Sequence, residues 1–127
     1  MKNWLFLVIE DEYDGQQVVS KILRYMGIHA EVAGTAEEAL DMMAGQAYTA
    51  AIIDLALPGM DGLELLARIR SDPATADMPC VMITAYHSSQ VKKQAVEAGI
   101  DLYFPKPIDD TTFIRELERL LDTESVA

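Results

Sequence analysis

Short apolar runs alternate with helical patterns along the whole chain, and this alternation limits the possible folds more than any other feature of the sequence. We expect strands at residues 4–9, 29–33, 50–54, 80–84 and 101–104, of which the second has the weakest pattern. Strands that alternate with helices predict a parallel sheet covered by helices on both faces. The sequence therefore predicts an α/β fold with five consecutive strand–helix units.

Each interval between these strands carries apolar residues at spacings near 3.6, as an amphipathic helix requires. The first helix has one apolar face, which contains Val18, Val19, Ile22, Leu23 and Met26. The last helix begins near Asp109 or Asp110, either of which can cap it, and is expected to bury Phe113, Ile114, Leu117, Leu120 and Leu121.

Two further signals mark the ends of the middle helices. Thr35 and Glu38 have the spacing of a capping box at the start of the second helix, which ends near Gly45. The third helix stops near Asp72, because the residue before a proline disfavours helical geometry. The fourth helix is expected at 88–98, with Gly99 behind it.

The length of 127 residues corresponds to one domain, which we place at 1–127 with a core at about 4–121. The formal net charge of −11 argues against a nucleic-acid partner, since phosphate contacts need clustered Lys and Arg.

No run approaches the roughly 18 apolar residues of a membrane span, and the N-terminus lacks a signal peptide. The single cysteine, Cys80, is expected to be a buried structural thiol. These features favour a cytoplasmic protein without a membrane partner.

Ligands of parallel α/β sheets bind at the carboxyl ends of the strands, so the residues found there are the candidates for chemistry. The first strand is followed by Glu10, Asp11 and Glu12, and the third ends at Asp54. Carboxylates about 4 Å apart repel by roughly 4 kcal/mol at an effective dielectric of 20 and need a counter-charge. Mg²⁺ is a suitable one. The alternative is that the first three acids are solvated loop residues that complement the helix dipole.

Asp54 ends a wholly apolar strand and precedes a glycine-containing turn, where it either begins the turn or acts as a nucleophile that forms an aspartyl phosphate. The fourth strand ends at Thr84, and Lys106 follows the fifth between two prolines. The Thr84 hydroxyl and the Lys106 ammonium are suited to stabilise charge on a transferring phosphoryl group. Taken alone, they would be an ordinary strand threonine and a solvated lysine.

Four segments together resemble the receiver domains of two-component response regulators. They are Val8-Ile9-Glu10-Asp11-Glu12, the stretch from Ile53 to Gly62, Ile83-Thr84-Ala85 and Lys106-Pro107. The resemblance covers roughly residues 4–121. It implies a flavodoxin-like fold with a five-stranded parallel sheet in the order 2-1-3-4-5.

The resemblance also implies roles for single residues. Glu10 and Asp11 match the acidic pair of the family, with Asp11 a direct Mg²⁺ ligand and Glu10 acting through water. Asp54 matches the phosphoacceptor, which also contacts the metal, and the Ala56 carbonyl matches the third protein ligand.

Three positions match the residues that respond to phosphorylation. Thr84 and Lys106 match those that contact the phosphoryl group, and Tyr103 matches the aromatic switch, although a partly buried tyrosine is the simpler interpretation. Ala56 and Tyr86 stand at positions that influence how fast the phosphoryl group is lost. We expect slow loss, because Ala56 has no polar side chain to orient water and Tyr86 is placed to shield the site.

By this resemblance the chain is a signalling phosphoacceptor rather than an enzyme. A histidine kinase or a phosphotransfer domain is the expected donor, and an output partner would bind the surface of the fourth helix, fifth strand and fifth helix. Dimerisation through the last two units is common in relatives. Two alternatives are a phosphatase of the haloacid-dehalogenase type, disfavoured because position 56 is Ala rather than Asp, and a docking module without phosphorylation.

Overall fold

The computed structural model describes residues 3–126 and the side chains of residues 3–122. Strands and helices alternate from one end to the other, as the sequence predicts. The strands are β1 (Leu5–Ile9), β2 (His29–Ala33), β3 (Ala50–Asp54), β4 (Cys80–Thr84) and β5 (Leu102–Pro105). The helices are α1 (Tyr13–Tyr25), α2 (Ala36–Gly45), α3 (Gly62–Ser71), α4 (Ser89–Glu97) and α5 (Asp110–Val126).

The five strands form one parallel sheet in the order β2-β1-β3-β4-β5, which confirms the expected flavodoxin-like topology. In the centre of the sheet, Ile9 pairs with Ile53, and Asp54 pairs with Ile83. The chain changes direction across the sheet between β1 and β3, the place where such folds bind ligands.

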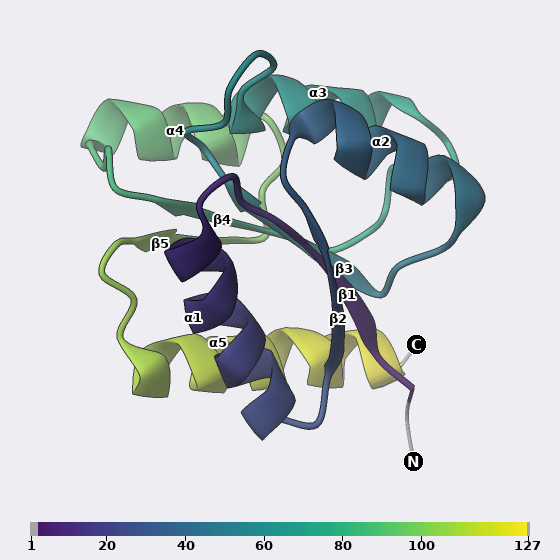
Figure 1. Cartoon of the computed structure of the whole chain (residues 1–127), viewed down its shortest axis with the longest axis vertical. Coiled ribbons are helices and arrows are strands. Elements are labelled where there is room, and N and C mark those ends of the chain that lie inside the picture. Colours follow the sequence, from purple (N-terminus) through teal and green to yellow (C-terminus); the bar gives the residue numbers. More distant parts are fainter. Residues whose placement is uncertain (1–2, 127) are drawn as a thin grey trace.

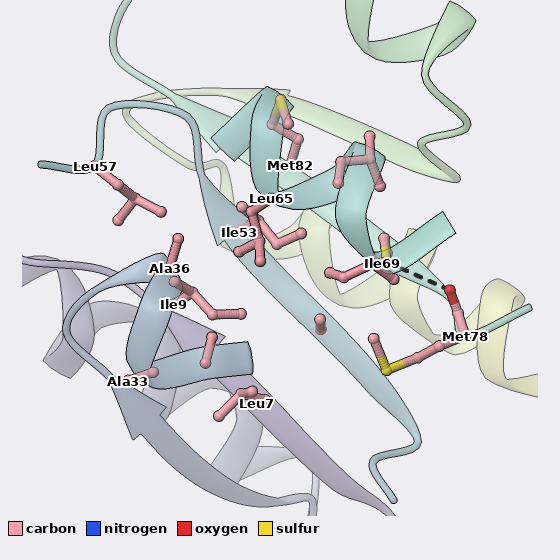
Figure 2. Close-up of a cluster of buried hydrophobic side chains, with 14 of the residues drawn as sticks. Leu7, Ile9, Ala33, Ala36, Ile53, Leu57, Leu65, Ile69, Met78 and Met82 are labelled. Carbon is pink, nitrogen blue, oxygen red and sulfur yellow. Dashed lines mark hydrogen bonds between the residues drawn. The ribbon is translucent and has the colours of Figure 1, made fainter. Parts of the chain in front are cut away.

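Helices cover both faces of the sheet: α1 and α5 lie on one side, and α2, α3 and α4 on the other (Figure 1). Successive strand residues point to opposite faces, so each central strand serves two cores. Leu7, Ile53 and Met82 belong to the cluster under α2, α3 and α4, part of which Figure 2 shows. Val8 and Ile52 belong to the cluster under α1 and α5. The central strands β3 and β4 are thus buried along their whole length, which leaves the strand ends as the accessible part of the central sheet.

The helix ends follow the sequence signals closely. The Thr35 hydroxyl accepts a hydrogen bond from the Glu38 N–H at 3.0 Å. The Glu38 carboxylate accepts one from the Gly34 N–H at 2.6 Å, one residue earlier than a reciprocal capping box requires. Ser88 caps α4 through the Val91 N–H. These caps satisfy backbone N–H groups at the starts of α2 and α4.

The apolar face predicted for α1 is not buried across its whole width. Val19, Ile22 and Leu23 are buried, whereas Val18 is 49% exposed. At 100° per residue, Val18 lies roughly 90° from the centre of the buried stripe. It lines a hollow of about 490 Å³ between α1 and the segment around Pro107.

Two strands are shifted by one residue from their expected bounds. β1 begins at Leu5 rather than residue 4, and β5 spans Leu102–Pro105 rather than residues 101–104. The Asp101 carboxylate instead accepts a hydrogen bond from the Cys80 N–H at 2.8 Å.

Cys80 is fully buried, as expected, and its burial raises the pKa of the thiol to about 12. Within residues 3–126, no helix combines the length and the apolar character that crossing a membrane needs.

Candidate functional site

Three buried polar side chains meet at the carboxyl edge of the sheet. Glu10 directly follows β1, Asp54 ends β3, and Thr84 ends β4. They are 1%, 4% and 0% exposed, and no other polar or charged side chain that the structure describes is buried. Burying polar groups costs free energy unless partners compensate. Their concentration at one edge therefore marks this edge as the candidate site.

Lys106 joins two of these side chains across the sheet. Its Nζ lies 2.9 Å from Asp54 Oδ2 and 3.2 Å from Glu10 Oε2. The position of Lys106 follows from β5, because its N–H donates to the Thr84 carbonyl at 2.8 Å and continues the ladder beyond Pro105. Burial alone would lower the pKa of Lys106, but its bonds to the two carboxylates raise it. The lysine is therefore a fixed positive charge in contact with Asp54.

The Asp54 carboxylate is kept ionised by its neighbours. Its Oδ1 accepts a hydrogen bond from the Ala56 N–H at 3.0 Å, and its Oδ2 accepts one from Lys106. Burial by itself would raise the pKa of Asp54. Hydrogen bonding with Glu10, Lys106 and Ala56, together with the Lys106 charge, lowers the pKa below its ordinary value instead. An ionised carboxylate is the nucleophilic form of this side chain.

Glu10 has the opposite electrostatic character. Its burial, followed by hydrogen bonding with and repulsion from Asp54, raises its pKa to about 7, although Lys106 opposes the shift. Its backbone is held on both sides, since its N–H donates to the Ala33 carbonyl at 3.1 Å and its carbonyl accepts from Gln16 Nε2 at 2.8 Å. Glu10 is therefore harder to ionise than an ordinary glutamate, even with Lys106 in contact.

A group of carboxylates suited to a metal ion lies next to this pair. Oxygens of Glu10, Asp11 and Glu12 all lie within 4.8 Å of one another, and Asp11 and Glu12 are exposed. Hard cations such as Mg²⁺ prefer oxygen ligands, and this donor set consists of carboxylates. The residues therefore fit a small divalent cation. This group shares Glu10 and Asp11 with the predicted ligand set of Glu10, Asp11, Asp54 and the Ala56 carbonyl, and adds the carboxylate of Glu12.

The remaining predicted residues, Thr84 and Tyr103, occupy two different surroundings. The buried Thr84 hydroxyl accepts a hydrogen bond from the Tyr86 N–H at 2.9 Å. Tyr103 is half-buried, and its hydroxyl is 2.9 Å from His87 Nδ1, with the two rings 5.4 Å apart. Burial raises the pKa of Tyr103. The tyrosine hydroxyl is thus engaged by the β4–α4 segment.

The structure brings Lys106 into direct contact with Glu10 and Asp54, whereas the Tyr103 hydroxyl contacts His87. Sequence reasoning missed Gln16, which binds the Glu10 carbonyl, and His87, which binds Tyr103. Neither residue belongs to a recognisable motif, because the Gln16 contact depends on how α1 packs beside the end of β1, and the His87 contact on the path of the β4–α4 segment. The roles of the contacting residues in phosphoryl transfer remain predictions at this point.

Comparison with known proteins agrees with the fold and with the motifs. Residues 6–118 match the family model described as the response regulator receiver domain. Response regulator MprA of Mycobacterium avium is 32% identical over 128 residues, which cover 95% of this chain and 55% of MprA. The chain therefore spans about half the length of that relative.

Solved structures show the same agreement. A putative response regulator from Chloroflexus aurantiacus superposes with a TM-score of 0.90 at 30% identity, covering 95% of this chain and 99% of that one. The receiver domain of sensor histidine kinase PA1611 from Pseudomonas aeruginosa, with a magnesium ion in its active-site cleft, has a TM-score of 0.84 at 25% identity and covers 93% and 97%. This chain belongs to the response regulator receiver domain family.

Proposed function

We propose that the chain is a phosphoacceptor whose Asp54 receives a phosphoryl group from the phosphohistidine of a histidine kinase or a phosphotransfer domain. The observation that carries the proposal is the Asp54 carboxylate itself: 4% exposed, 2.9 Å from the Lys106 ammonium and at the carboxyl end of the central strand. A buried aspartate with a lowered pKa and a cation in contact is prepared for nucleophilic attack.

In the proposed step, an Asp54 carboxylate oxygen attacks the phosphorus of phosphohistidine in line with the leaving imidazole. A phosphorus–oxygen bond forms, the phosphorus–nitrogen bond breaks, and its electron pair leaves with the imidazole. The Lys106 ammonium, which contacts the Asp54 carboxylate before the transfer, would contact a phosphoryl oxygen after it. The Thr84 hydroxyl accepts its present bond from Tyr86, so its own hydrogen is available for a second phosphoryl oxygen.

Mg²⁺ is the cofactor we propose for this site, held by Glu10, Asp11, Asp54 and the Ala56 carbonyl as the family resemblance implies. Its chemical contribution would be to neutralise negative charge shared by the acids and the phosphoryl group. The acidic group at residues 10–12 supports the proposal, as does the magnesium ion bound by the PA1611 receiver domain. Glu12 is a further carboxylate within reach of that position.

Phosphorylation of Asp54 would change a surface of the domain as well as the charge of the site. Movement of Thr84 toward the phosphoryl group vacates space beside Tyr103, whose inward turn would alter the α4, β5 and α5 surface. In this structure that turn would break the bond between Tyr103 and His87. We propose this surface as the binding site of an output partner or of a second copy. On this reading, residues 1–127 act as one signalling domain rather than as an enzyme.

The deciding experiment is incorporation of radiolabelled phosphate from acetyl phosphate with and without Mg²⁺. We expect stoichiometric, Mg²⁺-dependent labelling that Asp54→Asn abolishes and Asp77→Asn, a change at an exposed aspartate, leaves intact. Labelling that persists in Asp54→Asn would refute the assignment. Absence of label in the wild type would favour a docking module, and continuous turnover of phosphomonoesters would favour the hydrolase alternative.

The same assay measures how long the phosphoryl group persists. Tyr86 is 69% exposed at the rim of the site, and Ala56 carries no polar side chain. We expect slow hydrolysis that becomes faster in Tyr86→Ala, because the truncation opens the route for water. A lifetime of seconds that Tyr86→Ala does not change would contradict the shielding role.

A further inference from the structure

The first turn of α1 contains a glycine, Gly15, that helix formation alone does not explain. Gly15 is the third residue of α1, and glycine is a poorer helix former than alanine. Within residues 3–126, positive φ angles occur at Gly27, Gly59 and Gly99 and not at Gly15. Backbone geometry therefore does not require glycine at position 15.

The space around position 15 does require glycine. A Cβ atom added at Gly15 would lie 2.6 Å from both Cδ and Oε1 of Glu10 and 2.9 Å from its Cγ. Non-bonded carbon and oxygen atoms do not approach so closely, since carbon contacts are optimal near 3.5–4.0 Å. The missing side chain at Gly15 is the space in which the Glu10 carboxyl group lies.

Glu10 has little freedom to retreat from a new neighbour. Its Oε2 accepts from Lys106 at 3.2 Å, and its Oε1 accepts from the Glu12 N–H at 3.3 Å. Its backbone is fixed to β2 through Ala33 and to α1 through Gln16. The carboxyl group can move only by giving up the contact with Lys106 or with the loop.

We propose that Gly15 is a positioning residue for the proposed phosphorylation site: its missing side chain admits the longer Glu10 carboxylate beside Lys106, so that positions 10 and 15 form a matched pair. The inference deepens the proposed function and rests on it, because the role of Glu10 in the site is part of that proposal. Aspartate is one methylene shorter than glutamate. Glu10→Asp would withdraw the carboxyl group from α1 and leave room for a side chain at position 15.

The test compares Gly15→Ala in two backgrounds, the natural protein and Glu10→Asp, by calorimetric titration with Mg²⁺. In the natural background we expect affinity to fall by about tenfold, the scale for residues that orient metal ligands. In the Glu10→Asp background we expect the same change to alter affinity by less than about twofold, as independent positions do. Equal losses in both backgrounds would overturn the matched pair.

Thermal unfolding with a chelator present supplies a second readout that needs neither metal nor phosphorylation. Gly15→Ala should lower the melting temperature of the natural protein and raise that of Glu10→Asp, because alanine favours helix once the clash is gone. A rise in both backgrounds would refute the clash. Failure of the wild type to bind Mg²⁺ would count against the proposed function, while this pair of melting temperatures still decides the inference.

Gly45→Ala is the matched control. Gly45 is also helical, at the end of α2, and nothing lies within 4 Å of the Cβ it would gain. We expect it to leave Mg²⁺ affinity unchanged. If Gly15→Ala alone fails to fold, the double variant with Glu10→Asp is expected to fold, and its failure would also overturn the proposal.

Discussion

Two clusters of charge join distant parts of this chain, and they differ in how well their charges are matched. At the carboxyl edge of the sheet, Lys106 contacts two carboxylates, Asp54 and Glu10, whose side chains are 5% and 1% exposed. At the opposite edge, Arg70 pairs with Asp101 alone, and their side chains are 21% and 40% exposed. The first cluster is deeply buried and has more negative than positive charge, whereas the second is balanced.

Hydrogen bonding widens the difference. Arg70 donates to the backbone carbonyls of Ala76, Met78 and Gly99 at 2.7–3.0 Å, in addition to its bonds to Asp101. A planar guanidinium suits such a fixed array of acceptors. By contrast, the single ammonium group of Lys106 is shared by two carboxylates, those of Glu10 and Asp54. We infer that the Arg70 cluster stabilises the fold, while the Lys106 cluster keeps unbalanced charge available for chemistry.

The largest expected effect comes from removing the lysine. Lys106→Ala takes away a cation placed to meet charge on the transferring phosphoryl group, and loss of one such group typically costs about 100- to 1000-fold in rate. We expect labelling of Asp54 by acetyl phosphate to slow by about that factor at saturating Mg²⁺. Lys92→Ala, a change at an exposed lysine of α4, is the control. Equal rates for the two variants would remove Lys106 from the mechanism.

The next effect is a pH dependence of stability that belongs to Glu10. Its pKa in the folded protein is about 7, above the ordinary value of 4.5. Below pH 4.5 both the folded and the unfolded chain carry the proton. As the pH rises from 4.5 to 7, the unfolded chain releases the proton first, so the free energy of unfolding falls. The whole decrease is on the order of 3 kcal/mol.

Glu10→Gln removes this titration and therefore measures it. With Mg²⁺ chelated, urea unfolding of the wild type should lose stability relative to Glu10→Gln between about pH 4.5 and 7, and the difference should level off above that window. The lowered pKa of Asp54 acts in the other direction, because it contributes stability that is lost on acidification. Parallel pH curves for the two proteins would show that Glu10 keeps an ordinary pKa.

A smaller effect, on stability alone, is expected at the balanced cluster. Arg70→Ala leaves three backbone carbonyls without this donor, and we expect it to lower the free energy of unfolding by about 2 kcal/mol. Urea unfolding measures this loss, and labelling of Asp54 should be unchanged. Arg68→Ala, on the exposed side of the same helix, should change stability by less than about 0.5 kcal/mol. Slower labelling in folded Arg70→Ala would contradict the division between the two clusters.

These clusters also show which parts of the molecule a sequence can reveal. Glu10, Asp54 and Lys106 were identified because each adjoins the end of an apolar strand, and parallel topology brings such ends together. The periodic pattern also predicted the element bounds to within about one residue, whereas the strand order came from the resemblance to receiver domains. In contrast, nothing near Arg70 in the sequence identifies its acceptors, one of which is the carbonyl of Gly99 at the end of α4.

The failures have physical causes as well. The exposure of Val18 was not predicted, because apolar patterning gives the direction of a helix face but not its width. Gly15 carried no signal, since its importance depends on the side-chain conformation of Glu10, which no spacing encodes. Motifs thus predicted which residues come together at the candidate site, while the packing that holds those residues in place had to come from three-dimensional structure.

The smallest expected effect concerns the link between the acidic site and the α4–β5 surface. Tyr103 must give up its 2.9 Å hydrogen bond to His87 if it turns inward. One exposed hydrogen bond contributes about 0.5–1 kcal/mol. His87→Ala should therefore favour the inward state and increase the apparent affinity for beryllofluoride, a phosphoryl mimic, by about two- to fivefold.

The control for this prediction is His29→Ala, at an exposed histidine on the edge strand β2, which should leave the affinity unchanged. Beryllofluoride titration followed by NMR of the Tyr103 ring reports both binding and position. If His87→Ala weakens binding, the hydrogen bond belongs to the active arrangement rather than to the resting one. In that case His87 would hold Tyr103 in the signalling state, and the unbalanced charge at Asp54 would act on a surface already set for its partner.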